Sequence, residues 1–196
     1  MVNMALPVSA RRRLFTTEEY EQMIRAGILR EDDRVELLRG EILEMAPIGL
    51  RHSACVSRLS KLLERTVGER AIVWVQNPVL LPDHSMPQPD VTLLRWRDDF
   101  YARSRPIPQD VLLLVEVADT SLVLDRTAKV PLYAQAGIPE MWLVNLIEDT
   151  IEVYRQPQGQ QYARVSTVGR GQSLAFALPG MPEVSLRVDD ILGTNG

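Results

Sequence analysis

The chain has little cysteine, little lysine and no long apolar run. The shortage of cysteine and the lack of a long apolar run each exclude a class of protein. Its single cysteine, Cys55, rules out an internal disulfide framework and a zinc site built on cysteines. No stretch approaches the roughly 20 apolar residues that span a bilayer. Residues 1–10 also lack the charged and apolar regions of a signal peptide. We therefore expect a cytoplasmic protein with no membrane partner.

An excess of positive charge is also missing, because the formal net charge is -4. This balance gives no overall attraction to nucleic acid, although local basic patches can override it. Lys61 and Lys129 are the only lysines among 22 basic residues, and the others are arginines. A lysine kept against such a preference indicates a position that needs a compact ammonium group.

The length of 196 residues suffices for one sizeable core. We predict a flexible leader over residues 1–14 and a single domain over residues 15–192. Helical and strand periods are mixed along that domain. This pattern is typical of an α/β (α+β) fold with a mixed central sheet, flanking helices and extra β-hairpins.

Caps and periodicity place the first elements. Thr16 and Glu19 have the spacing of a capping box, which predicts a helix to about Ala26. Residues 34–45 predict a hairpin that turns at Arg39-Gly40. Residues 50–68 have a helical period, and their apolar stripe consists of Val56, Leu59, Leu63 and Val67.

The later elements alternate between strands and one helix. A helix is predicted over 125–136, although Pro131 suits only the first turn, so this helix should start late or kink. A hairpin over 150–168 should turn at 157–159, and short strands and a terminal turn should follow over 173–192. Further strands are predicted at about 71–76, 78–81, 91–94, 111–118 and 140–145.

A carboxylate inside an apolar strand is the main indication of function. Glu116 lies within the apolar run 110–118, and its desolvation costs several kcal/mol unless something pairs with it. Asp90, at the start of a neighbouring strand, could share a divalent metal ion with it. The carbonyl of Val117 could be a further ligand. Hard oxygen ligands of this kind are what metal-dependent phosphodiester cleavage requires.

Two more charged residues could belong to the same site. Lys129 follows Glu116 on the next helix, which folds back toward the strand, so its ammonium could offset charge on a phosphate. Glu36 lies between Val35 and Leu37 in the first hairpin and is another acid in an apolar setting.

Each of these residues also has an ordinary structural interpretation. Asp90 could be a turn residue after proline. Glu116 could face solvent on an edge strand, and Glu36 could be an exposed strand residue. Lys129 could be a solvated helix residue, and His52 a polar residue at a helix start.

Longer blocks of sequence resemble a known family. The matching residues are Val35-Glu-Leu-Leu-Arg-Gly-Glu-Ile42, His52, Gln88-Pro-Asp-Val91, Leu114-Val-Glu-Val117, Asp125 through Lys129 to Tyr133, Ala136-Gly-Ile-Pro-Glu140 and Trp142-Leu-Val144. Together they resemble the Uma-two family of candidate restriction endonucleases, within the PD-(D/E)xK nuclease superfamily. The resemblance covers roughly residues 15–192.

The resemblance implies a restriction-endonuclease-like fold and hydrolysis of DNA that depends on Mg²⁺ or Mn²⁺. It makes Asp90 and Glu116 the metal carboxylates and Glu36 an auxiliary acid. The lysine that usually stands two residues after the glutamate is absent, because Ala118 stands there. Lys129 resembles its displaced substitute.

Basic residues outside this set are the predicted phosphate contacts, which position DNA without reading its sequence. They are Arg58, Lys61, Arg65, Arg95 and Arg97. We expect a homodimer, because paired sites commonly cleave a duplex. The alternatives are a catalytically inactive nuclease-fold module that binds DNA or protein, and a structural or toxin-like interaction protein.

Overall fold

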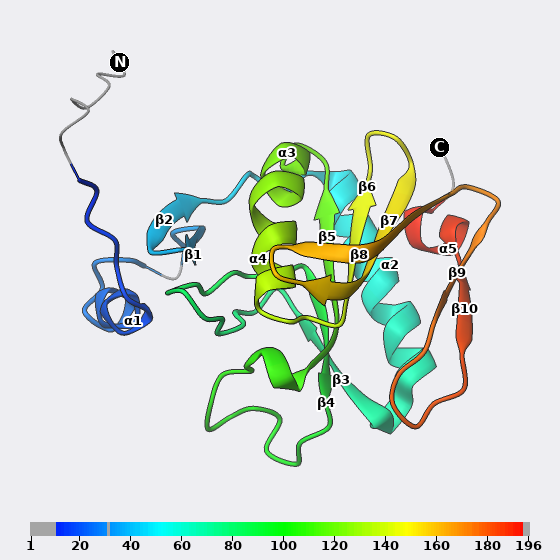
Figure 1. Cartoon of the computed structure of the whole chain (residues 1–196), viewed down its shortest axis with the longest axis horizontal. Coiled ribbons are helices and arrows are strands. Elements are labelled where there is room, and N and C mark those ends of the chain that lie inside the picture. Colours follow the sequence, from blue (N-terminus) through cyan, green and yellow to red (C-terminus); the bar gives the residue numbers. More distant parts are fainter. Residues whose placement is uncertain (1–10, 31, 194–196) are drawn as a thin grey trace.

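A six-stranded mixed sheet forms the centre of the protein, in a computed structural model that describes residues 11–30 and 32–193 (Figure 1). The strand order is β3-β4-β5-β6-β7-β8. Neighbouring strands run antiparallel except for β5 and β6, which are parallel. The strands are β3 (Ala71–Val75), β4 (Val91–Arg95), β5 (Val111–Ala118), β6 (Glu140–Asn145), β7 (Thr150–Gln158) and β8 (Gln161–Gly169).

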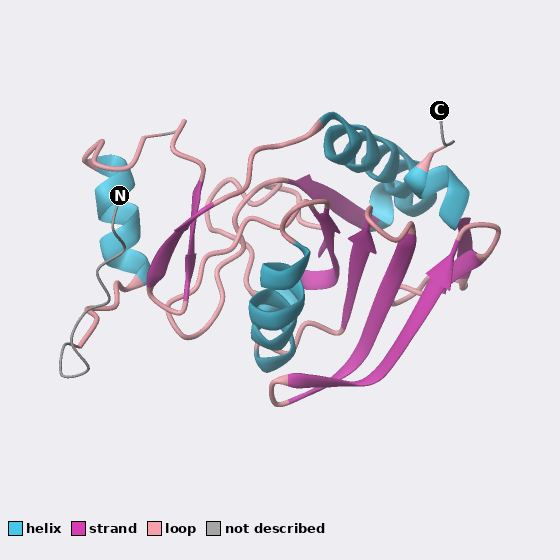
Figure 2. Cartoon of the chain, turned by 90° about the horizontal axis from the view of Figure 1, so that it is seen from above, coloured by secondary structure: helices cyan, strands magenta, loops and turns pink. Residues whose placement is uncertain are grey.

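Helices cover both faces of this sheet (Figure 2). The helices α2 (Leu50–Val67) and α5 (Val188–Leu192) lie on one face. On the other face a continuous helical segment consists of α3 (Leu122–Leu124), the π-helical turn η3 (Asp125–Lys129) and α4 (Val130–Gln135). This arrangement confirms the predicted fold class. No helix within the described ranges is long and apolar enough to cross a membrane.

Strand β5 is buried on both faces, which explains its apolar run without alternation. Leu113, Val115 and Val117 pack in the core beside α2. Leu114 and Ala118 point to the opposite face and pack in the core beside α4. Because side chains alternate along a strand, Glu116 projects toward the α4 side. The interpretation of Glu116 as an exposed edge-strand residue is therefore wrong.

A small N-terminal unit lies beside the sheet and consists of α1 (Thr17–Arg25), β1 (Val35–Leu38) and β2 (Glu41–Glu44) (Figure 1). The capping box is confirmed, since Glu19 N–H donates to Thr16 Oγ1 at 3.1 Å and Thr16 N–H donates to Glu19 Oε2 at 3.0 Å. The β1–β2 hairpin turns at Arg39 and Gly40, both with positive φ. A side chain at Gly40 would collide with Leu14, since its Cβ would lie 2.7 Å from that residue's Cβ.

A second small hairpin precedes α5, and α5 packs on α2. Strands β9 (Ser173–Phe176) and β10 (Val184–Arg187) pair antiparallel and lead into α5. The guanidinium of Arg58, on α2, donates to the carbonyls of Ile191 at 3.0 Å and Leu192 at 2.5 Å. Arg58 therefore caps the carboxyl end of α5.

We expect Arg58→Ala to lower the free energy of unfolding by about 1.5–3 kcal/mol, because two charge-assisted hydrogen bonds are lost. Chemical denaturation measures this loss. Lys61→Ala, an exposed substitution on the same helix, is the control and should change stability by less than about 0.5 kcal/mol. Equal stabilities of the two variants would contradict the capping role.

Three predicted boundaries differ from the structure. Residues 78–81 form no regular strand, and Leu81 makes only an isolated bridge to Ser85. The helix predicted over 125–136 does not start late: it begins at Leu122, and a π-helical turn over 125–129 places Pro131 in the first turn of α4. The β7–β8 pairing extends to Gln158, so the turn lies at 159–160. Of the predicted leader 1–14, residues 1–10 lie outside the described ranges.

Candidate active site

The four predicted catalytic residues line one pocket of about 130 Å³. Glu36 comes from β1, Asp90 from the loop just before β4, Glu116 from β5 and Lys129 from η3. The pocket lies at the end of the sheet where β4 begins and β5 ends, between the N-terminal unit and the start of α2. The structure therefore brings together residues that are spread over more than ninety positions of sequence.

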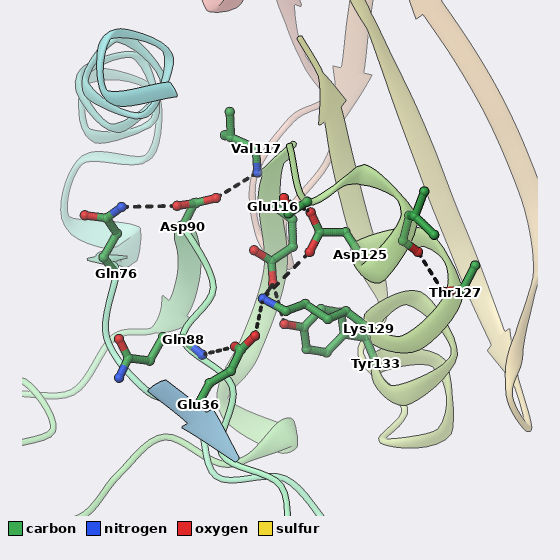
Figure 3. Close-up of polar contacts among 12 residues, drawn as sticks. Glu36, Gln76, Gln88, Asp90, Glu116, Val117, Asp125, Thr127, Lys129 and Tyr133 are labelled. Carbon is green, nitrogen blue, oxygen red and sulfur yellow. Dashed lines mark hydrogen bonds and ion pairs between the residues drawn. The ribbon is translucent and has the colours of Figure 1, made fainter. Parts of the chain in front are cut away.

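Sheet register explains why Asp90 meets Glu116. Val91 pairs with Val115 in the antiparallel β4–β5 ladder, so the next step along each strand sets Asp90 opposite Glu116. The backbone N–H of Val117 donates to Asp90 Oδ2 at 2.8 Å, as Figure 3 shows. Asp90 is only 8% exposed and lines the pocket, so it is not a simple turn residue.

Two further side chains hold the carboxylate of Asp90. The amide of Gln76 donates to Oδ1 at 3.2 Å (Figure 3). Nε2 of His52, from the first turn of α2, lies 3.1 Å from Oδ2. This hydrogen bond raises the pKa of His52, and burial of the imidazole opposes that rise. His52 is thus a partner of Asp90, a role that its position at the helix start did not predict.

Lys129 lies at the centre of a buried charged group that we call the Lys129 cluster. Its Nζ is 3.0 Å from Glu36 Oε1, 3.2 Å from Glu116 Oε1 and 3.8 Å from Asp125 Oδ1 (Figure 3). Only 5% of Lys129 is exposed, so it is not a solvated helix residue. Burial opposes the charged form, but the surrounding carboxylates outweigh it and raise the pKa of the ammonium.

The cluster holds more negative than positive charge. Burial raises the pKa of Glu116 well above its usual value, and Asp125, Asp90 and Glu36 add to that rise while Lys129 opposes it. The hydroxyl of Tyr133 donates to Glu116 Oε1 at 2.5 Å. Because three carboxyl groups share one ammonium, the site favours a further positive charge, whether a proton or a cation.

Asp125 and Tyr133 were missed as site residues, although the sequence contains a signal for them. They lie four residues before and four residues after Lys129, and such spacing puts helical residues on one face. A polar residue on each side of a helical lysine is common, so the signal alone was weak. Gln76 has no comparable signal in the sequence. It lies just after β3, at a position with positive φ.

The donor set fits a hard divalent cation such as Mg²⁺. Asp90, Glu116 and the carbonyl of Val117 are oxygen donors, the type that Mg²⁺ prefers. Glu116 Oε2 receives no hydrogen bond from a described residue, whereas Oε1 receives two contacts. Among the described residues, no group of three or more His, Cys, Asp or Glu side chains is arranged to hold a metal ion. The two carboxylates Asp90 and Glu116 are the kind of ligand set that Mg²⁺ accepts, since it usually binds one or two carboxylates and keeps several waters.

The predicted phosphate contacts lie elsewhere, and none of the five lines the pocket. Arg58 binds α5, as described above. Arg95 donates to the carbonyl of Gln109 at 2.9 Å. Arg97 pairs with Asp99 at 2.8 Å and stacks over the ring of Tyr101. Their contact with DNA stays a prediction for nucleic acid that extends beyond the pocket.

Comparisons with known proteins agree with the sequence motifs. The family model described as "Uma2: Putative restriction endonuclease" matches residues 17–189. A similar fold is found in a solved structure described as "Crystal structure of a putative nuclease belonging to DUF820 from Anabaena variabilis ATCC 29413". That match has a TM-score of 0.71 and 18% sequence identity, and it covers 91% of this chain and 97% of the other. No curated protein matches the chain.

Proposed function

Because the chain belongs to the Uma2 family, we propose that it is an endonuclease that hydrolyses DNA phosphodiester bonds with Mg²⁺ or Mn²⁺. The observation that carries this proposal is the meeting of Asp90, Glu116 and Lys129 in one pocket. Two buried carboxylates, one just before β4 and one in the neighbouring β5, beside a buried ammonium are costly to fold. A site of this composition is therefore more readily explained by chemistry than by stability.

Asp90, Glu116 and the Val117 carbonyl would hold the ion. When bound, it offsets the negative charge that develops on the phosphoryl oxygens. The residues around Asp90 fix its orientation: the Val117 N–H, the Gln76 amide and the His52 imidazole contact both carboxylate oxygens. Such preorganisation removes the cost of turning a carboxylate during the reaction.

Lys129 and Tyr133 would keep the carboxylate of Glu116 in place. Both contact Oε1, and no described residue donates a hydrogen bond to Oε2. Glu36 would act as the auxiliary acid, held by Lys129 and by the Gln88 N–H, which donates to its Oε2 at 3.2 Å. A homodimer with one site for each strand of a duplex belongs to the same proposal.

The proposal is tested by incubating supercoiled plasmid DNA with the protein and Mg²⁺ or Mn²⁺. We expect wild type to nick or linearise the plasmid and chelation to stop it. Asp90→Asn keeps the size of the side chain and one acceptor oxygen but removes the charge, and should lower the rate at least about a hundredfold. Agarose electrophoresis over time measures the rate.

Asp190→Asn serves as the matched control, because Asp190 is an exposed aspartate on α5 outside the pocket. It should cleave like wild type. Absence of cleavage by wild type, or equal cleavage by Asp90→Asn, would count against a nuclease. Salt-sensitive DNA binding without cleavage would instead favour the alternative, a nuclease-fold binding module. An RNA substrate run in parallel decides between the two nucleic acids.

A further inference from the structure

The ammonium of Lys129 is already paired with three carboxylates of the protein. A lysine ammonium carries three N–H groups, and its Nζ lies within 4.0 Å of three carboxylates, those of Glu36, Glu116 and Asp125. Its positive charge is already shared among more negative charge than it can balance. A phosphate entering the pocket therefore needs a different cation.

Arg34 is the other Lys or Arg residue among the described residues that line the pocket. It is exposed, and its guanidinium forms no ion pair or hydrogen bond with the described part of the chain. Arg12 and Arg51, by contrast, are engaged: Arg12 pairs with Glu41 and Arg51 with Asp149. Arg34 thus has five donors available at the mouth of an acidic pocket.

The β1 strand explains how Arg34 reaches this position. Its backbone carbonyl accepts the N–H of Met45 at 2.7 Å, which fixes the start of the β1–β2 hairpin. Arg34 directly precedes β1, two residues before Glu36, and both residues line the pocket. Val35, between them, packs with the small core of the N-terminal unit. One short strand and the residue just before it therefore supply a buried carboxylate inside the pocket and an exposed guanidinium at its mouth.

We propose that Arg34 binds a phosphate group of the nucleic-acid substrate at the mouth of the active-site pocket, an inference that rests on the nuclease function proposed above. A guanidinium can bind two phosphate oxygens at once. Its charge offsets the repulsion between the phosphate and the acids that line the pocket. The N-terminal unit is then a substrate-binding part of the site as well as the source of Glu36.

The test measures binding of a fluorescent duplex oligonucleotide in the presence of a chelator, and cleavage of the same duplex with Mg²⁺. Arg34→Ala should weaken binding about tenfold. It should also lower the slope of log affinity against log salt by about one, because one phosphate contact is lost. Arg34→Lys should keep the salt slope and recover only part of the affinity, because a lysine cannot bind two oxygens in a fork.

Arg30→Ala is the matched control. Arg30 is an exposed arginine in the segment before β1, it pairs with Asp32 at 3.1 Å, and it does not line the pocket. It should bind and cleave like wild type. Thermal melting of each variant shows whether the fold is kept, which is expected because the Arg34 side chain forms no ion pair or hydrogen bond with the described residues.

The outcomes separate this inference from the proposed function. If wild type cleaves and Arg34→Ala binds with unchanged affinity and salt slope, the role of Arg34 is wrong and the nuclease stands. If wild type binds without cleavage and Arg34→Ala binds more weakly, Arg34 contacts phosphate and the nuclease is wrong. If wild type neither binds nor cleaves nucleic acid, both are wrong.

Discussion

Replacing Glu116 by glutamine is expected to stabilise the protein at about pH 8 while abolishing hydrolysis. The substitution removes one negative charge from the Lys129 cluster and leaves Lys129 with Glu36 and Asp125. The glutamine oxygen can still accept from the hydroxyl of Tyr133, as Glu116 Oε1 does at 2.5 Å. Relief of buried like-charge repulsion should contribute about 1–3 kcal/mol. This corresponds to about 2–4 °C of melting temperature per kcal/mol for a chain of this size.

The gain should depend on pH with a definite sign. The pKa of Glu116 is raised in the folded protein, chiefly by burial, so the folded state binds a proton more tightly than the unfolded state. Stability of wild type from this group is therefore greatest below the unfolded pKa of about 4.5 and falls as pH rises toward the folded pKa. Glutamine does not titrate, so the advantage of Glu116→Gln should be small near pH 5 and larger near pH 8.

Glu152→Gln is the matched control, because Glu152 is also a buried strand glutamate, only 8% exposed. Glu152 pairs with Arg126 and accepts from the hydroxyl of Tyr154. Its charge has a partner of opposite sign, so removing it should lower the melting temperature or leave it unchanged. A Glu116→Gln variant that melts below wild type at about pH 8 would contradict the excess negative charge that we assign to the cluster.

The same variant also tests the metal independently of activity. Mn²⁺ should raise the melting temperature of wild type, because a ligand that binds only the folded state stabilises it. Glu116→Gln should lose most of that rise, since one of the two carboxylate ligands is gone. An equal shift in both proteins would place the ion elsewhere.

The strands could be predicted from the sequence where burial on both faces gives a continuous apolar run. Strands β5 and β6 match the predicted runs because both are covered on two faces, so most of their residues are apolar. The run 78–81 was mistaken for a strand because apolar residues there fill the core without a neighbouring strand to pair with. Burial and pairing are separate properties, and periodicity reports only the first.

The site residues also separate into those that the sequence could predict and those that it could not. Asp90 and Glu116 could be predicted together because two adjacent strands fix their separation. The proton donors and acceptors around them could not, because Gln76 and His52 reach Asp90 from parts of the chain that only the tertiary fold brings near. The π-helical turn was also hidden, although Pro131 signalled that the helix could not be regular.

Replacing Lys129 by methionine is expected to be the most destabilising single change in the site. It leaves Glu36, Glu116 and Asp125 buried without the ammonium that contacts all three. Removing one partner of a buried ion pair costs about 3–5 kcal/mol. This is a large part of the 5–15 kcal/mol that typically holds a domain folded. Denaturant titration measures the loss, and lowering the pH should recover part of it by protonating the carboxylates.

The other lysine of the chain gives the control. Lys61 is exposed on α2, so Lys61→Met should change stability by less than about 0.5 kcal/mol. If Lys129→Met unfolds at the same denaturant concentration as Lys61→Met, the contacts of Lys129 contribute nothing to the fold.

Loss of cleavage by Lys129→Met alone cannot separate a catalytic role from a structural one, and a second substitution can. Adding Glu36→Gln removes one negative charge and returns the cluster to the net charge of wild type. Stability should then recover over that of Lys129→Met, because fewer buried carboxylates repel one another. If cleavage recovers with stability, Lys129 acts only by balancing charge. If stability recovers and cleavage does not, the ammonium or Glu36 acts in the reaction itself, and Glu36→Gln alone decides between them.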